Sequence, residues 1–300
     1  MSGTSDTAHS GAKHAIGNHF GGRLRLNIDW ITRPLFGFVL AGIAVAATFR
    51  GGLAFAILLS LGCAGAIREW HRLFTRRDFL LPTVITILAL IGALVCQLEI
   101  PALKMPLSRY WPYGILVVGS LCNLLLGASR RQWPFAHAAG PIYIALPALS
   151  LLVIRQTPMY SLWLVVLIFL AVWATDTGAL VSGNLIGGAK LAPRLSPNKT
   201  WAGSIGGLAC AAVIGIAVAT FLHARIWPAT VFALLLSLAG QFGDLFESFV
   251  KRRMGRKDSG GLIPGHGGVL DRIDSMLFAA PVAAVAILVF GFDPLAGIHP

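Results

Sequence analysis

The chain has 300 residues, of which 56% are hydrophobic and only 12% are charged, and its formal net charge is +12. Soluble domains carry about 25% charged residues, so this composition excludes an ordinary soluble protein and predicts an integral membrane protein. The basic residues lie in loops between apolar runs and not on one soluble module, which argues against nucleic acid as a partner and favours membrane lipids and phosphates.

Residues 1–29 are rich in Gly, Ser and His and show no periodicity. Such a segment cannot bury enough apolar surface to fold, so we expect a disordered basic tail. The rest of the chain changes character near residue 160. Residues 30–159 are interpreted as transmembrane scaffold helices, and residues 160–300 as a catalytic transmembrane domain, because polar side chains concentrate there at helix ends.

Nine apolar stretches follow the tail. About 17 to 25 helical residues cross the hydrocarbon core, and shorter stretches need polar extensions or local thinning of the bilayer. We therefore predict an all-α, polytopic membrane protein with about nine transmembrane helices. The stretches are Pro34–Phe49, Leu53–Ile67, Phe79–Leu98, Tyr113–Ala128, Phe135–Ile154, Tyr160–Thr175, Trp201–Leu222, Trp227–Glu247 and Ser275–Phe292.

The basic residues predict which way these helices cross. If the N-terminus is cytoplasmic, nineteen of the 24 Lys and Arg residues fall in cytoplasmic segments and five fall outside. The split follows the positive-inside rule, and one miscounted helix would invert every later loop. We therefore expect a multi-pass protein of the inner (cytoplasmic) membrane, with the N-terminus in the cytoplasm and the C-terminus outside.

The first concentrated polar groups of the second half are Asp176 and the loop before Trp201. Asp176 follows sixteen mostly apolar residues, so we expect it at the inner boundary, where it could join a metal site. The loop brings hydroxyls, an amide and a cation to a predicted helix start, where the macrodipole and free amides favour an anion. These residues are Ser196, Asn198, Lys199 and Thr200. Ser196 or Thr200 acting as a plain helix cap is the alternative.

The most informative segment runs from Ser248 to Asp274. It holds six Lys or Arg, three Asp, one His and six Gly between two apolar runs. A charge at a helix centre in a bilayer costs about 2.5 to 3.5 kcal/mol, so such groups normally face a partner or a water-filled cavity. We therefore expect the active site here, on the cytoplasmic side.

Acidic residues flank this segment on two predicted helices. Asp244 shares a helix face with Glu247 and Lys251, and Asp271 shares one with Asp274 at the start of the next helix. Brought together, the two acidic helix ends would form an oxygen cage suited to Mg²⁺. The alternative is that the acids only neutralise neighbouring basic residues.

Between these helix ends lies a loop of cations and glycines. Glycines such as Gly267 and Gly268 let backbone N–H groups approach phosphate oxygens with no Cβ in the way, which suits a triphosphate. His266 could protonate or hydrogen-bond a leaving phosphate, and a structural turn histidine is the alternative. A basic loop that only sets topology does not explain this density of Gly, Pro, His and acids.

These residues resemble the phosphatidate cytidylyltransferase family, the CDP-diacylglycerol synthases. The signature S-x-x-K-R-x4-K-D-x-G-x2-I-P-x-H-G-G-x2-D-R-x-D is matched in full from Ser248 to Asp274, and S-P-x-K-T-W-x-G-S is matched from Ser196. The similarity is clear over residues 160–292. Two positions depart from the family pattern, since Asn198 stands where Lys is usual and Ala202 where Glu is usual.

The resemblance implies a membrane enzyme of phospholipid biosynthesis that converts CTP and phosphatidic acid into CDP-diacylglycerol and pyrophosphate. It implies Mg²⁺, with a monovalent cation as a candidate for a second site. With the residue pattern, it predicts metal ligation by Asp244 and Asp271, with Asp176 and Asp274 close by, and catalytic roles for Lys251 and Arg272. The residues expected to bind CTP and the lipid phosphate are Ser196, Asn198, Lys199, Thr200, Arg252, Lys257, Asp258, His266, Gly267 and Gly268.

Other functions remain as alternatives at this stage. A family member could act on another lipid phosphate or be catalytically impaired. A transporter of an anionic solute would also carry intramembrane acids and basic loops, but it predicts polar residues along several helices at the membrane midplane. The sequence does not give acyl-chain preference or oligomeric state, and a homodimer stays open.

Overall fold

The structure is a computed structural model that describes residues 42–75, 77–98, 110–157, 160–262 and 267–298. The predicted tail of residues 1–29 and His266 lie outside these ranges. Residues from Val45 onward belong to one compact unit.

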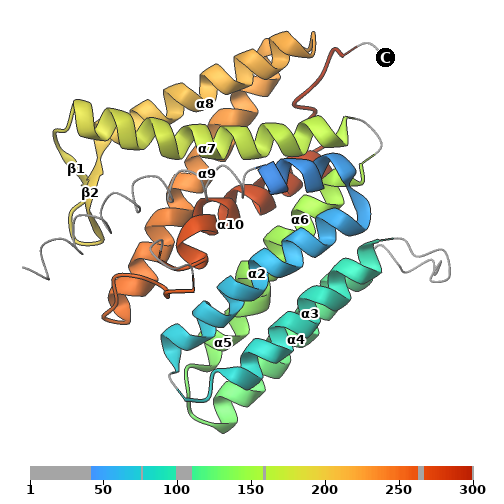
Figure 1. The fold of residues 1–300 in the computed structure, drawn as a ribbon, viewed down its shortest axis with the longest axis vertical. Helices are drawn as coiled ribbons and strands as arrows, with labels where there is room; N and C mark the ends of the chain where they lie inside the picture. The colour runs from blue at the N-terminus through green and yellow to red at the C-terminus, as the bar shows by residue number, and fades with distance from the viewer. Residues whose placement is uncertain (1–41, 76, 99–109, 158–159, 263–266, 299–300) are drawn as a thin grey trace, which may run out of the picture. The chain divides into compact units, whose positions relative to one another are not determined.

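The unit is a helical bundle with one small hairpin (Figure 1). Its first half contains α2 (Gly52–Phe74), α3 (Leu80–Gln97), α4 (Trp111–Ser129), α5 (Pro134–Gly140), the π-helical segment η2 (Pro141–Ala145) and α6 (Leu146–Arg155). Its second half contains α7 (Ser161–Leu185), β1 (Lys190–Ala192), β2 (Ser196–Thr200), α8 (Trp201–Phe221), α9 (Ile226–Arg253), α10 (Leu270–Ala284) and the π-helical segment η3 (Val285–Val289).

Eight helices in the described ranges are long and apolar enough to cross a membrane, when α5 to α6 and α10 to η3 are each taken as one span. They correspond to the last eight of the nine predicted stretches, which confirms the all-α, polytopic class. Most of the first stretch, Pro34–Phe49, falls outside the described ranges, although residues 45–50 are helical. The helix α9 continues to Arg253, beyond the apolar stretch that ends at Glu247, and it includes Lys251, as the predicted helix face of Asp244, Glu247 and Lys251 requires.

The span formed by α5, η2 and α6 is the most enclosed. In its most apolar window 67% of the residues are buried, against 28% for α4. Leu149, Leu152 and Ile154 of α6 are fully buried, while α4 exposes Val118 and Leu125. An exposed apolar face suits lipid contact, so α4 reads as peripheral and α6 as central.

Small residues bring α7 and α8 close together. A Cβ added at Gly207 would lie 2.9 Å from the backbone oxygen of Thr175, and one at Gly203 would lie 2.8 Å from that of Ala179. Both contacts are closer than a real Cβ tolerates, so only glycine allows this separation. This close contact lies beside the turn of α7 that carries Asp176, because Thr175 precedes that residue.

A glycine also allows α9 and α10 to approach each other closely. A Cβ at Gly243 would lie 2.6 Å from the backbone oxygen of Asp274. Because Gly243 precedes Asp244, the close approach brings the acidic ends of the two helices together.

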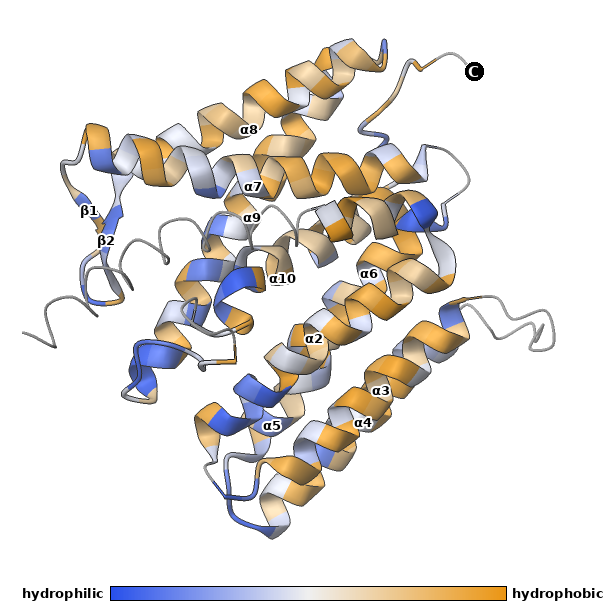
Figure 2. Ribbon diagram, in the orientation of Figure 1, coloured by the Kyte–Doolittle hydropathy of each residue, from blue (hydrophilic) through white to orange (hydrophobic). Residues whose placement is uncertain are grey.

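The β1–β2 hairpin was not predicted. Its strands are antiparallel, with Lys190 opposite Thr200 and Ala192 opposite Ser196. The predicted loop is therefore a structured arm that leads directly into α8. Hydrophilic residues gather around this hairpin, at the end of α9 and at the start of α10, while most of the helical surface is hydrophobic (Figure 2).

Candidate active site

One cavity on the polar side of the bundle gathers many of the predicted site residues. Its volume is about 600 Å³, and α7, the hairpin, the start of α8, α9 and the start of α10 all contribute to its wall. Its carboxylates belong to Asp176, Asp244, Asp271 and Asp274, and its cations to Lys190, Lys199 and Arg272. A wall that carries both signs of charge can hold a polyanion together with cations.

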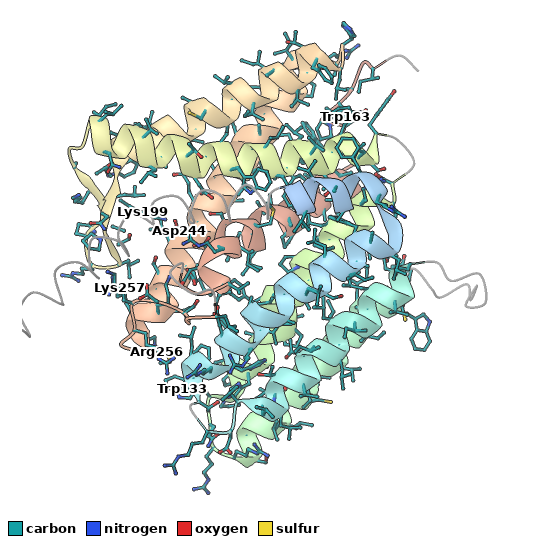
Figure 3. All side chains as sticks on the ribbon, viewed as in Figure 1. Trp133, Trp163, Lys199, Asp244, Arg256 and Lys257 are labelled. Carbon is teal, nitrogen blue, oxygen red and sulfur yellow. The ribbon has the colours of Figure 1, made fainter. Side chains whose placement is uncertain are left out.

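Lys199 and Asp244 form an ion pair across this cavity (Figure 3). Lys199 lies on β2, directly before Thr200, whose side-chain oxygen accepts a hydrogen bond from the Gly203 N–H at 3.0 Å. Thr200 is thus the N-cap of α8, which confirms the helix-cap alternative for this residue. The cap and the strand together fix where Lys199 meets Asp244.

Asp271 connects α9, α10 and the segment between them. Lys251 Nζ lies 2.7 Å from Asp271 Oδ1 and 2.8 Å from Glu247 Oε2. The backbone N–H groups of Ser259 and Gly268 also donate to the Asp271 carboxylate, at 3.2 and 3.0 Å. The alternative that the acids neutralise nearby cations therefore describes part of what Asp271 does.

Asp176 and Asp274 meet at Ser275. The Ser275 hydroxyl donates to Asp176 Oδ1 at 3.2 Å, and the Ser275 N–H donates to Asp274 Oδ1 at 2.8 Å. The Asp274 carboxylate is also close enough to Asp244 and Asp176 to be repelled by their charge. Like charges on one wall favour a cation among them.

The donor chemistry of the cavity fits Mg²⁺, which prefers carboxylate oxygens, water and phosphate oxygens. Four carboxylates share the wall. Within the described ranges, however, no three His, Cys, Asp or Glu side chains stand together as a ready metal cage. Asp244 and Asp271 are instead paired with Lys199 and Lys251.

The structure brings eight of the predicted site residues to this cavity wall and places others elsewhere. The lining residues among them are Asp176, Asn198, Lys199, Thr200, Asp244, Asp271, Arg272 and Asp274. Lys251 is adjacent to the wall through Asp271. Ala202, one of the two departures from the family pattern, is not among the described lining residues, although Thr200, Gly203 and Ser204 next to it are.

Six predicted binding residues are not among the described residues of this wall. Ser196 pairs with Ala192 across the hairpin. Arg252 Nε donates to the Leu195 carbonyl at 3.3 Å, so Arg252 supports the hairpin turn. Lys257 lies on the segment beyond α9 (Figure 3). Asp258 lines a second cavity of about 430 Å³ with Arg72 and Arg256. Gly267 and Gly268 begin the described part that leads into α10, and Gly268 contacts Asp271.

Two charged groups in or beside the site were missed by sequence reasoning, as were the polar lining residues Asn184, Ser204, Gln241 and Ser275. Lys190 lines the cavity from β1. It was not predicted as a site residue, because its position there depends on the hairpin, which was not predicted. Glu69 of α2 is buried against the segment between α9 and α10, where it accepts hydrogen bonds from Ser259 and Leu270. The only signal in the sequence is an acid near the end of an apolar run, which by itself is also typical of a helix-end ion pair.

Comparison with known proteins shows the family of this chain. The chain matches the cytidylyltransferase family over residues 31–290. The chain belongs to the cytidylyltransferase family. Among curated members, the phosphatidate cytidylyltransferase of Brucella suis is 40% identical over 264 residues, which cover 83% of this chain and 90% of that protein. The phosphatidate cytidylyltransferase of Staphylococcus epidermidis is 31% identical, covering 85% of this chain and 98% of that protein.

Membership of the cytidylyltransferase family covers both halves of the chain. The match begins before the first described helix and ends just after η3, so it includes the helices interpreted as scaffold as well as those that line the cavity. The resemblance seen in the signature is therefore confirmed for the chain as a whole.

Proposed function

We propose that the chain transfers CMP from CTP to phosphatidic acid, giving CDP-diacylglycerol and pyrophosphate. The observation that carries the proposal is the cavity of about 600 Å³, in which the carboxylates and cations of the signature and of the hairpin face one another at the polar ends of membrane-spanning helices. The relatives named phosphatidate cytidylyltransferase support the same substrates.

The reaction joins two polyanions. A phosphate oxygen of phosphatidic acid attacks the α-phosphorus of CTP, a new P–O bond forms, and the bond to the oxygen that leads to the β-phosphorus breaks, so pyrophosphate leaves with that electron pair. A phosphate monoester has a second pKa of about 6, so the nucleophile is largely ionised at neutral pH and no strong general base is needed. The chain must instead offset charge repulsion and align the reactants.

The cations of the cavity are suited to that task. Lys190, Lys199 and Arg272 face the space where phosphates would lie, and Lys251 keeps the Asp271 carboxylate in place. Leu180 of α7 also belongs to the wall and is 65% exposed, so apolar surface adjoins the polar cavity. This combination suits a lipid phosphate whose chains stay in the bilayer while its headgroup reaches the nucleotide.

We propose Mg²⁺ as the cofactor, held by carboxylates drawn from Asp176, Asp244, Asp271 and Asp274. When bound, Mg²⁺ would neutralise phosphate charge and polarise the phosphorus–oxygen bonds. The measurement is thermal unfolding with CTP present, with and without Mg²⁺. Stabilisation by CTP should require Mg²⁺ and should disappear in Asp244→Asn. Equal stabilisation in the presence of a chelator would contradict the assignment.

The activity is tested with the purified protein in mixed micelles, labelled CTP and phosphatidic acid. We expect CDP-diacylglycerol and pyrophosphate in equal amounts, and a loss of at least about 100-fold in Asp271→Asn, since removal of one electrostatic group from such a site typically costs about 10²- to 10³-fold. The matched control is Arg194→Gln on the hairpin turn. If folded protein used an isoprenoid phosphate and not phosphatidic acid, the substrate assignment would be wrong.

We further propose that the protein lies in the inner (cytoplasmic) membrane with its active site facing the cytoplasm. The support is the distribution of basic residues and the clustering of polar helix ends around the cavity. A homodimer and a second, monovalent cation stay as predictions from the sequence.

A further inference from the structure

Glu69 is an acid of α2 that the reaction above does not use. It is 2% exposed, and it is not among the described residues that line the cavity. Its Oε2 atom accepts hydrogen bonds from the Ser259 hydroxyl at 3.1 Å and from the Leu270 N–H at 2.9 Å. These donors lie 190 and 201 residues later in the chain, so the contact joins α2 to the signature segment.

One donor lies within the segment between α9 and α10, and the other lies at the start of α10. Ser259 follows α9, and Leu270 is the first residue of α10. Ser259 contacts two acids at once, because its hydroxyl meets Glu69 while its N–H meets the Asp271 carboxylate. Leu270 is the direct neighbour of Asp271. Glu69 thus holds Leu270, which precedes Asp271 in the chain, and also Ser259, whose N–H donates to the Asp271 carboxylate.

Two glycines of the signature lie directly against Glu69. A Cβ at Gly260 would overlap the Glu69 carboxylate, and a Cβ at Gly268 would lie 2.6 Å from Glu69 Oε2. A larger residue at either position would push the segment away from α2. These glycines are therefore explained by close packing on Glu69, in addition to any approach to phosphate.

Keeping this acid buried is costly. Its second oxygen, Oε1, is buried and has no hydrogen-bond partner among the residues that the structure describes. A buried carboxylate with incomplete hydrogen bonding is unfavourable, and well-packed apolar side chains often serve stability as well or better. A role in holding the signature segment accounts for an acid at this position.

We propose that Glu69 is a positioning residue for the transfer reaction. It holds Ser259 and Leu270, and through them it fixes where the Asp271 carboxylate faces the cavity. The inference rests on the proposed function for its kinetic consequences, but the structural contact can be tested without any activity.

The kinetic test uses Glu69→Ala, Ser259→Ala and the double variant. Each single variant should lower kcat about 10- to 100-fold, as the loss of a supporting contact to a catalytic group typically does, with a smaller change in the KM for CTP. Because both act through one contact, the double variant should lose little more than the worse single variant. Glu69→Gln keeps an acceptor oxygen and the shape, so it should retain more activity than Glu69→Ala. Multiplicative losses in the double variant would overturn the proposal.

The structural test is limited trypsin digestion of the full-length protein in detergent. Lys257 lies two residues before Ser259, so release of the segment should speed cleavage after Lys257 in Glu69→Ala. Unchanged cleavage in folded Glu69→Ala would overturn the proposal. Because cleavage is measured without substrate, faster cleavage in a protein that made no CDP-lipid would point to an error in the proposed function and not in the role of Glu69.

Arg155→Met is the matched control. The Arg155 guanidinium makes hydrogen bonds to the Thr48 carbonyl at 2.8 Å and to the Ser161 hydroxyl at 3.1 Å, and it lies at the ends of α6 and α7 remote from the signature segment. Its loss should lower the unfolding temperature but leave both kcat and cleavage at Lys257 unchanged. If Arg155→Met reproduced both effects of Glu69→Ala, general destabilisation would explain them and the proposal would fail.

Discussion

Lys199 is placed in the cavity by strand register and by a helix cap. Strand pairing places Thr200 opposite Lys190, and the Thr200 side chain caps α8. Lys199 directly precedes this fixed residue, and its side chain reaches Asp244. A cation held in this way needs little reorganisation when a phosphate arrives. Lys199 is therefore the residue at which a change of charge should have the clearest effect.

Lys199→Met should lower kcat/KM for CTP by about 10- to 100-fold, because a hydrogen bond to a charged group is worth about 1.5 to 3 kcal/mol. Steady-state kinetics in mixed micelles measures it. Lys199→Arg keeps the charge and should lose less. Arg194→Met, which removes a cation from the exposed hairpin turn, should stay near the activity of the unaltered protein. Equal losses in Lys199→Met and Arg194→Met would show that only the general charge of the hairpin matters.

Ala202→Glu addresses the departure from the family pattern. Ala202 lies in the first turn of α8 and is not among the described residues of the cavity wall. An acid in the first turn of a helix interacts well with the helix dipole, so we expect a stability gain of about 0.3 to 1 kcal/mol and unchanged turnover. Thermal unfolding and initial rates measure the two effects. A rise in turnover of tenfold or more would mean that this position acts on the reaction.

At this scale the sequence predicted much of the site. The acids at Asp176, Asp244, Asp271 and Asp274 were expected together, because helix periodicity places them at the ends of apolar spans, and they line one cavity. Lys190 and Glu69 were missed for a physical reason. Their roles depend on contacts with residues far along the chain, and no local spacing reports such contacts.

The approach of α9 to α10 is the element-scale feature on which the acidic cluster depends. Gly240 also faces α10, where an added Cβ would lie 3.3 Å from Ser275 Cβ. Gly240 and Gly243 are one turn apart, so they form one glycine face on α9. Without that face, the carboxylates of the two helices would stand farther apart.

Gly243→Ala should separate the two helices. Its Cβ would meet the Asp274 backbone oxygen, which cannot move without moving α10. Overpacking of this kind typically costs about 1 to 3 kcal/mol of unfolding free energy, and the shift should also lower turnover. Thermal unfolding and kinetics measure the two effects.

Gly62→Ala on α2 is the matched control, because, apart from the neighbouring backbone of its own helix, no atom of the described residues lies within 4 Å of the added Cβ. It should be neutral or stabilising by about 0.5 to 1 kcal/mol, since alanine is the better helix former. If Gly243→Ala behaved like Gly62→Ala, the contact between α9 and α10 would be looser than the structure indicates.

Elements were predictable where a long apolar run defined them. The eight described spans were foreseen with shifted ends, because hydropathy locates a span but caps and packing set its last turns. The hairpin was not foreseen, since strands of three and five residues with a Pro in β2 give no alternating pattern to detect. Its existence depends on pairing between β1 and β2 and on the start of α8.

In the molecule as a whole, the described lining of the cavity comes from the second half of the chain, and the first half contacts the segment beside it through Glu69. Residues from Val45 onward belong to one compact unit, and Glu69 joins α2 to the segment before α10. The division near residue 160 therefore describes where catalytic side chains are concentrated, and it stays a prediction as a domain boundary. A helix predicted as scaffold can still hold a catalytic segment in place.

The orientation of the bundle can be tested on intact cells. Ser129 ends α4 and Gln156 follows α6, and both are exposed and expected on opposite sides of the membrane. In a background with Cys63, Cys96, Cys122 and Cys210 replaced by Ala, a membrane-impermeant thiol reagent should label Gln156→Cys on intact cells and Ser129→Cys only after permeabilisation. The reason is the excess of Lys and Arg on the Ser129 side, which opposes translocation of those loops. The reverse pattern would place the cavity outside the cell, where CTP is not supplied, and would contradict both the orientation and the proposed reaction.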